Sequence, residues 1–425
     1  MTNISRYIAI VALLTLSAFQ AHAARIFIPM NAGEQANHLK AYGIAYAALQ
    51  KEIEVDWLLN YEGGSFCMVQ TEFIERLCKL RGVSYQVMSD AQYNGILNTI
   101  SDPDYNGDII KLEKAPKIAV YTPKGKQPWD DAVTLVLTYA EIPYDEIYDD
   151  EVLLEKLPEY DWLHLHHEDF TGQYGKFWAA YRNAAWFQED VKNNEAIAAR
   201  HGFKKVSKLK LAVAKKIQAF VAGGGYLFAM CSATDSYDIG LAAQNTDICE
   251  IPFDGDPSSP NAQNELDFTQ GFAFKDYVLS RNPYEYEFST IDATQTRNQF
   301  INMETDYFTL FTFSAKFDPV PTMLCQNHTT TVKGFMGQTT AFRKEVLKTS
   351  VLVMGECKPA NEARYIHGEF GKGTWTFYGG HDPEDYQHAI GDPPTDLSLH
   401  PNSPGYRLIL NNVLFPAARK KPKKT

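Results

Sequence analysis

Short apolar runs alternate with longer segments of helical periodicity through the first part of the chain. Three runs rich in apolar side chains predict strands, at residues 25–30, 54–60 and 83–88. Residues 37–50 and 71–82 repeat apolar positions every three to four residues, which predicts helices. Since strands that alternate with helices usually form a parallel sheet, we expect a small α/β domain over residues 24–105.

The same alternation resumes after a turn-rich link at residues 101–108. Strands are expected at residues 117–123, 144–149, 161–170 and 226–231. Helices are expected between them, at residues 129–142, 151–160 and 206–225. Right-handed crossovers would bring the carboxyl ends of these strands to one edge of a parallel sheet, where ligands bind.

The alternation is lost between about residues 243 and 361, where strand-like pieces lie among turns rich in Asp, Pro and Asn. We interpret this segment as an irregular insertion, with strand-like pieces at 307–316 and 321–327. The regular pattern returns with a strand at 351–356, a hairpin at 363–380 and a helix at 405–415. The second domain is therefore expected over residues 106–418, followed by a basic tail at 419–425.

The first 23 residues have the pattern of a signal peptide. Arg6 precedes an apolar run at residues 8–16, and Ala21 and Ala23 supply small side chains before an expected cleavage near Ala23. The run is too short to span a bilayer, so we expect no transmembrane span in the mature chain and a periplasmic or secreted location. An uncleaved anchor is the alternative.

Composition and charge narrow the class of protein. Apolar residues make up 45% and charged residues 22%, which is typical of a folded globular chain. The net charge is -12 and only the last residues are strongly basic, which argues against a nucleic-acid partner. In an oxidising compartment some of the six cysteines could pair, but their spacing does not say which.

Cys231 is the candidate nucleophile. It follows a buried strand and opens a small-residue turn into a helix, where a side chain projects from the sheet and backbone amides can bind an oxyanion. A helix amino end also lowers the pKa of a thiol. The alternative is a small buried cysteine without chemistry. Residues expected around the thiol, as oxyanion donors or pocket walls, are Ser232, Gly225, His166, His167, Glu168 and Gly172.

His381 is the candidate base. It follows the strand of the predicted hairpin, and Asp382, Glu384 and Asp385 come directly after it. A nucleophilic cysteine commonly needs a histidine that a carboxylate holds in place. The alternative is a histidine and acids that only order a loop.

A histidine-rich segment, His164 to Asp169, offers a different chemistry. Its imidazoles and carboxylates could bind a divalent metal together with His381 or His388, since these ligands suit zinc. No HExxH or paired CxxC motif supports a metal, so a polar pocket is the alternative and no other cofactor is expected. Aromatic residues from 170 to 187 could form a lid, a carbohydrate-stacking surface or core.

Two stretches carry a resemblance to a known family. The runs FVAGGGYLFAMCSATD and GKGTWTFYGGHDPEDY, with the closing GYRLILNNVLF, resemble the trehalose-utilisation (ThuA-like) branch of the class I glutamine amidotransferase-like superfamily. The resemblance covers roughly residues 117–415 without the insertion. It implies a flavodoxin-like parallel sheet with helices on both faces.

The chain departs from that family at two positions. ThuA-like members usually carry histidine where this chain has Cys231, which is more similar to a true glutamine amidotransferase. In those enzymes a carboxylate comes two residues after the histidine, in the order His-Pro-Glu. This chain has His381-Asp382-Pro383-Glu384, so the acid is displaced by one residue. If the family roles transfer, Cys231 attacks, His381 is the base, and Glu384 or Asp382 orients it.

The whole chain also resembles exported bacterial proteins often labelled asparagine synthetase B. True members of that enzyme family have an amino-terminal catalytic cysteine and an SGG-type nucleotide loop, and this chain has neither. We therefore expect a Cys-dependent hydrolase or amidohydrolase-like enzyme acting on a small or carbohydrate-linked substrate. The alternatives are a non-catalytic sugar- or peptide-binding protein and a structural partner in a cell-envelope assembly.

Overall fold

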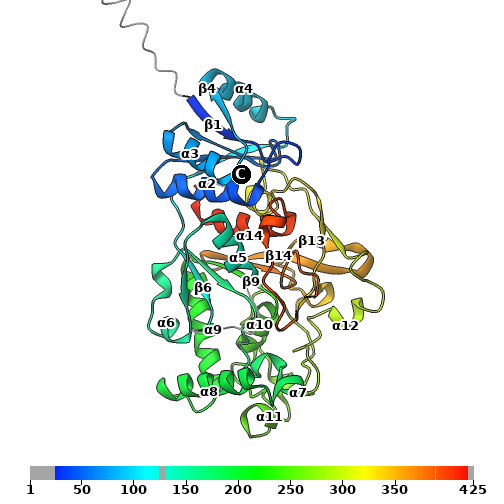
Figure 1. Ribbon diagram of the computed structural model, residues 1–425. Coiled ribbons are helices and arrows are strands. Elements are labelled where there is room, and N and C mark those ends of the chain that lie inside the picture. Colours follow the sequence, from blue (N-terminus) through cyan, green and yellow to red (C-terminus); the bar gives the residue numbers. More distant parts are fainter. Residues whose placement is uncertain (1–23, 124–130, 388, 420–425) are drawn as a thin grey trace, which may run out of the picture.

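The computed structural model describes residues 24–123, 131–387 and 389–419, and the expected signal peptide, His388 and nearly all of the basic tail lie outside these ranges. Two sheets organise the chain (Figure 1). The small sheet contains five strands, which are β1 (Ala24–Ile28), β2 (Val55–Leu59), β3 (Ser65–Val69), β4 (Gln86–Ser89) and β5 (Asp108–Leu112). Its helices are α2 (His38–Gln50), α3 (Glu72–Arg81) and α4 (Asp90–Ser101).

The small sheet is antiparallel throughout, in the order β4-β1-β3-β2-β5, and the expectation of a parallel sheet in this domain is wrong. The reason is strand β3, which lies in a segment where no strand was expected. Only residues 60–64 join β2 to β3, and so short a connection makes a hairpin, because parallel strands need a crossover of a dozen or more residues. The sheet also includes β5, which lies beyond residue 105.

The large sheet has ten strands, ordered β11-β10-β13-β14-β15-β9-β8-β6-β7, with β12 paired to β14. The strands of its first half in sequence are β6 (Ile118–Tyr121), β7 (Asp145–Ile147), β8 (Trp162–Leu165) and β9 (Tyr226–Met230). The others are β10 (Tyr307–Leu310), β11 (Thr331–Lys333), β12 (Phe342–Arg343), β13 (Leu352–Cys357), β14 (Glu362–Phe370) and β15 (Gly373–Tyr378).

This sheet is mixed, so the expected parallel arrangement describes only part of it. Strands β7, β6, β8, β9 and β15 run parallel to one another. Strands β14, β13, β10 and β11 extend it with antiparallel pairs. Two of these added strands, β10 and β11, come from the segment interpreted as an irregular insertion, which therefore widens the sheet instead of only leaving it.

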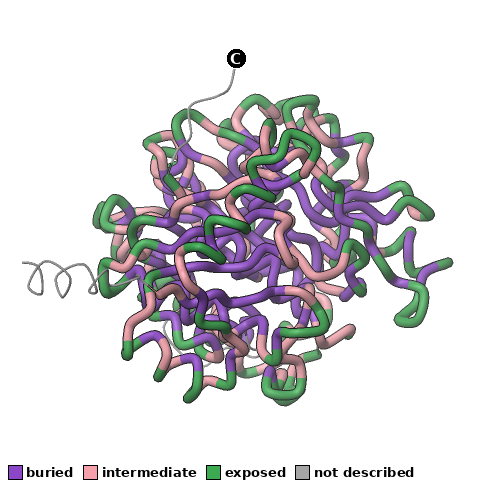
Figure 2. The backbone as a smooth tube through the Cα atoms, turned by 90° about the horizontal axis from the view of Figure 1, so that it is seen from above, coloured by how far each residue is buried: buried purple, intermediate pink, exposed green. Residues whose placement is uncertain are grey.

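Helices cover both faces of the parallel strands. Alternate side chains of β6, β8 and β9 enter two different hydrophobic clusters, as the twofold periodicity of a strand requires. One cluster includes α5 (Ala132–Ala140) and α14 (Pro404–Leu414), and the other includes α9 (Val206–Gly223) and α10 (Ala233–Ala242). Figure 2 shows the buried residues gathered at the centre of the molecule.

The remaining helices border these layers or lie in the insertion. They are α6 (Asp149–Leu153), α7 (Trp178–Tyr181), α8 (Ala185–Arg200), α11 (Ile251–Asp254), α12 (Thr294–Arg297) and α13 (Pro319–Leu324). Helix α13 lies where residues 321–327 were expected to be strand-like, so that expectation is wrong. Pro319 and Pro321 stand at its start, where a missing N–H costs no helical hydrogen bond.

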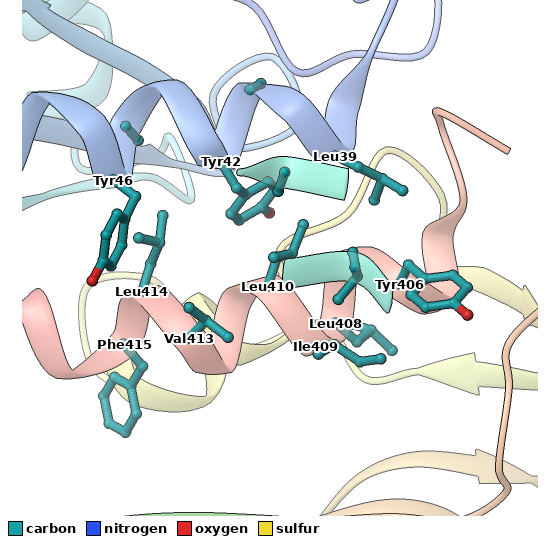
Figure 3. Packing of buried hydrophobic residues seen from close by; sticks show 14 of the residues in the cluster. Leu39, Tyr42, Tyr46, Tyr406, Leu408, Ile409, Leu410, Val413, Leu414 and Phe415 are labelled. Carbon is teal, nitrogen blue, oxygen red and sulfur yellow. The ribbon is translucent and has the colours of Figure 1, made fainter. Parts of the chain in front are cut away.

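The two sheets share one hydrophobic cluster through helices α2 and α14 (Figure 3). Leu39 and Tyr42 of α2 face Leu410 of α14, and all three are fully buried. The guanidinium of Arg407 on α14 reaches across this contact and donates to the carbonyl oxygens of Met30 at 3.2 Å and Gly63 at 2.8 Å. The small antiparallel unit is thus packed firmly on the larger one.

Candidate functional site

Four loops meet where the parallel strands end. Asp131 follows β6, His166 and His167 follow β8, Cys231 follows β9, and His381 follows β15. These four strands are consecutive parallel neighbours, so their carboxyl ends lie at one edge of the sheet. The edge predicted from the sequence is therefore where the candidate residues come together.

Cys231 occupies a strained turn between β9 and α10. Its φ is +50°, a left-handed conformation that is uncommon outside glycine. Its amide donates to the Gly380 carbonyl oxygen at 3.1 Å, and the Gln338 amide donates to its sulfur at 3.4 Å. Burial raises the pKa of the thiol to about 11, although the amides of Gln338, Ser232 and Thr339 oppose the rise. The resting thiol is therefore protonated at neutral pH.

His166, His167 and His381 form a compact cluster. Each contributes one ring nitrogen to a group in which all three nitrogens lie within 4.8 Å of one another. The ring centroids of His166 and His381 are 4.4 Å apart. Two of the imidazoles are buried, and His167 is half-buried. Three imidazoles at this spacing match the ligand set of a catalytic zinc site, which keeps one further position open.

Two buried residues, His164 and Asp131, lie close to the Nδ1 atom of His166. His164 places its Nε2 atom 3.1 Å from His166 Nδ1 and its Nδ1 atom 3.1 Å from the Phe228 carbonyl oxygen. Asp131 Oδ2 lies 3.4 Å from His164 Nε2 and 3.5 Å from His166 Nδ1. Burial opposes ionisation of Asp131, but the facing imidazoles of His166 and His164 outweigh it and lower the pKa of the carboxyl.

Glu168 places a carboxyl group against the backbone of His166. Its Oε2 atom accepts the amide of His166 at 3.1 Å, whereas its Oε1 atom has no hydrogen-bond partner among the described residues. Burial, and then the charge of Asp131, raise the pKa of Glu168 to about 8. A carboxyl with such a pKa can exchange a proton near neutral pH.

The acids after His381 are engaged elsewhere. Asp382 accepts hydrogen bonds from the hydroxyls of Tyr406 at 2.8 Å and Thr395 at 2.7 Å. Glu384 lies 3.1 Å from His400 Nδ1. These bonds fix the loop onto α14 and the segment before it, and none of the three involves His381.

The remaining predicted pocket residues are dispersed. The Ser232 amide faces the thiol of Cys231, as expected. Gly172, at φ +84°, passes so close to α9 that a Cβ atom would lie 2.7 Å from the Ser207 backbone, which is a packing role. Gly225 precedes β9 whereas Cys231 follows it, so the two residues lie at opposite edges of the sheet. The structure does not bring Gly225 to the site.

Sequence analysis missed Asp131, Asp235 and Gln338. Asp131 carried a local signal, since an aspartate before an apolar helical run is a helix cap, and its Oδ1 indeed accepts amides of α5. Asp235 is the last residue of the run FVAGGGYLFAMCSATD, in the first turn of the helix that follows Cys231. Its Oδ1 atom accepts the Thr339 hydroxyl at 2.9 Å. Gln338 had no signal, because the insertion that carries it shows no regular pattern.

Most of the aromatic segment forms core. Phe170, Phe177 and Phe187 are buried in the cluster that includes α9. A cleft of about 380 Å³ nevertheless lies beside it, between α7, α8 and α11, with Trp178 and Phe253 among its walls.

All six cysteines, each within the described ranges, are free thiols. None of the helices in those ranges combines the length and apolar character needed to cross a bilayer.

Comparison with known proteins identifies no family. No family model and no curated protein matches the chain. Among solved structures, a cytoplasmic protein from Salmonella typhimurium covers 72% of this chain and all of its own at 12% identity, with a TM-score of 0.36. A second Salmonella typhimurium cytoplasmic protein covers 65% of this chain and 91% of its own at 12% identity (TM-score 0.32).

A third solved structure, the GH42 beta-galactosidase Gan42B, covers 63% of this chain and 28% of its own at 11% identity (TM-score 0.26). TM-scores as low as these three support no inference about this chain.

Proposed function

We propose that the protein is a hydrolase that uses a divalent metal ion held by His166, His167 and His381. The observation that carries the proposal is the convergence of one nitrogen from each imidazole within 4.8 Å. The donor set fits zinc, and His167 is half-buried whereas the other two imidazoles are buried. A bound cation would supply a Lewis acid that polarises the bond to be hydrolysed.

Glu168 is the acid or base of this proposal. Its Oε1 atom is available, and its pKa of about 8 suits proton exchange at neutral pH. In its ionised form the carboxyl takes a proton from the attacking water, and in its protonated form it returns the proton to the leaving group. The buried surroundings keep other water away from the reacting bond.

Thiol chemistry at Cys231 is the second candidate, favoured by the left-handed φ of +50° at a strand-to-helix turn. In that reaction Cys231 attacks and His381 accepts its proton. The thiol pKa of about 11 makes the proton acceptor indispensable. The family roles would assign Asp382 or Glu384 to orient His381, and these carboxylates contact Tyr406 and His400.

The parallel half of the large sheet supports a flavodoxin-like core of the ThuA-like kind. In chain order its strands are arranged 2-1-3-4-5, which is the flavodoxin-like order. The cluster begins at the switch point between β6 and β8, where such folds bind ligands. In keeping with the signal-peptide pattern, the enzyme would act in the periplasm or outside the cell.

A binding protein remains the non-catalytic alternative, holding a sugar or peptide at the same edge, alone or within a cell-envelope assembly. The test uses the mature chain purified with Zn²⁺, assayed on a panel of nitrophenyl esters and anilides. Chelation and the His381→Ala substitution should abolish turnover, while Cys231→Ser and the surface control His201→Gln should preserve it.

The opposite pattern, with loss only in Cys231→Ser and none on chelation, would establish the thiol reaction. Absence of turnover together with absence of stoichiometric zinc would leave only the binding role.

A further inference from the structure

His164 and Asp131 have no part in the proposed reaction, yet both are buried and both face His166. His164 is fully buried and Asp131 is 7% exposed, and burying polar groups is costly unless they are hydrogen-bonded. Their contacts determine where the protons of His166 lie.

The carbonyl oxygen of Phe228 fixes the first proton. A carbonyl only accepts, so His164 Nδ1, 3.1 Å away, must carry a hydrogen. In a neutral imidazole the other nitrogen, His164 Nε2, is then an acceptor. It lies 3.1 Å from His166 Nδ1, which must therefore donate.

Asp131 acts on the same hydrogen. Its Oδ1 atom accepts the amides of Val133 at 2.7 Å and Thr134 at 2.9 Å, which anchors the carboxylate at the start of α5. Its Oδ2 atom is thereby held 3.4 Å from His164 Nε2 and 3.5 Å from His166 Nδ1, where its negative charge favours a proton between these two nitrogens. Because a neutral His164 already carries its hydrogen on Nδ1, that proton belongs to His166 Nδ1.

We infer that His164 and Asp131 are positioning residues that fix His166 as the Nδ1–H tautomer. The lone pair of His166 is then on Nε2, the ring nitrogen that does not contact His164. Outer partners of this kind orient metal-binding histidines and raise their basicity. The consequence for metal affinity rests on the proposed function, whereas the tautomer does not.

The tautomer is measured first, in the metal-free full-length protein labelled with [¹⁵N]histidine. Long-range ¹H–¹⁵N spectra, assigned by the loss of signals in His166→Gln, should show His166 protonated at Nδ1 and bare at Nε2. A spectrum with the proton on Nε2 in the wild-type protein overturns the inference, whether or not the protein binds metal.

Variants then separate positioning from packing. His164→Phe keeps a ring between Trp162 and Phe228 but removes the acceptor, whereas His164→Gln offers an amide oxygen in its place. The Phe variant should mix the two tautomers and weaken Co²⁺ binding by about 10- to 100-fold, and the Gln variant should restore most of both. His367→Phe is the control, since it removes a buried histidine outside the cluster. It should change neither the tautomer populations of His166 nor the Co²⁺ affinity.

Equal tautomer populations and equal Co²⁺ affinities in His164→Phe and the wild-type protein would refute the positioning role. If the wild-type protein bound no Co²⁺, the proposed hydrolase would fall, and the tautomer spectra would still decide the present inference.

Discussion

Asp235 should make the protein less stable as the pH rises from about 4 to about 7. The residue lies in the first turn of α10 and is fully buried. Its Oδ1 atom accepts the Thr339 hydroxyl at 2.9 Å, and its Oδ2 atom has no hydrogen-bond partner within the described ranges. Burial raises the pKa of this carboxyl from 3.8 to about 7.

The size of the effect follows from that shift. A difference of about 3 pKa units corresponds to about 4 kcal/mol. Between pH 4 and 7 the folded protein binds more protons at Asp235 than the unfolded chain does, so the free energy of unfolding falls as the pH rises. The penalty is absent below about pH 4 and complete above about pH 7.

The Asp235→Asn substitution removes the titration while keeping an oxygen that accepts from Thr339. Urea unfolding followed by tryptophan fluorescence at pH 5, 6, 7 and 8 gives the free energy of unfolding of both proteins. Relative to the wild-type protein, the variant should gain about 3 kcal/mol between pH 5 and pH 8.

Asp104→Asn, at an exposed position, is the matched control and should leave the two stability curves parallel. Parallel curves for Asp235→Asn as well would show that the buried carboxyl does not titrate in this window, and the argument from burial would be wrong.

Three further outcomes follow from packing and burial. Leu410→Ala should lower the free energy of unfolding in urea by about 3 kcal/mol, because it opens a cavity between α2 and α14. A loss below about 1 kcal/mol would mean that this contact is loosely packed. Gly172→Ala should lower the melting temperature, and the free energy of unfolding by about 2 kcal/mol or more, because φ is +84° and the added Cβ would meet Ser207. Gly202→Ala is the control, since its φ is +78° but the space around it is open, and it should lose less stability. Iodoacetamide should label Cys231 far more slowly at pH 8 in the folded protein than in urea, because burial raises the pKa of the thiol to about 11. Peptide mass spectrometry measures the labelling, and rapid labelling of the folded protein would show that the thiol pKa is lower than this value.

Much of the helical layout could be predicted from the sequence. Helices α2, α3, α9 and α14 lie where apolar residues recur at helical spacing. Gly82 ends α3 in the left-handed conformation expected of a helix-terminating glycine. These features depend on residues a few positions apart, so a local pattern is sufficient to specify them.

Strand partners were not predictable in the same way. A strand's pattern records which faces are buried, but not which strand lies beside it or in which direction. Whether β3 pairs antiparallel to β2, or β13 to β14, depends on loop length and on distant segments. The directions of the strands in the small sheet and the addition of β10 and β11 to the large sheet were therefore not expected, whereas the hairpin of β14 and β15, joined by a short turn, was predicted correctly.

The sequence by itself determined which chemistry is available: a cysteine at a strand-to-helix turn, a histidine-rich strand end and a histidine after the late hairpin. The tertiary structure decided which of these groups meet. It grouped His381 with His166 and His167, bonded Asp382 and Glu384 to other residues, and placed Asp131 behind the cluster. Distances between side chains from separate strands depend on sheet order and loop packing, which arise from contacts far apart in the chain and which local patterns do not encode.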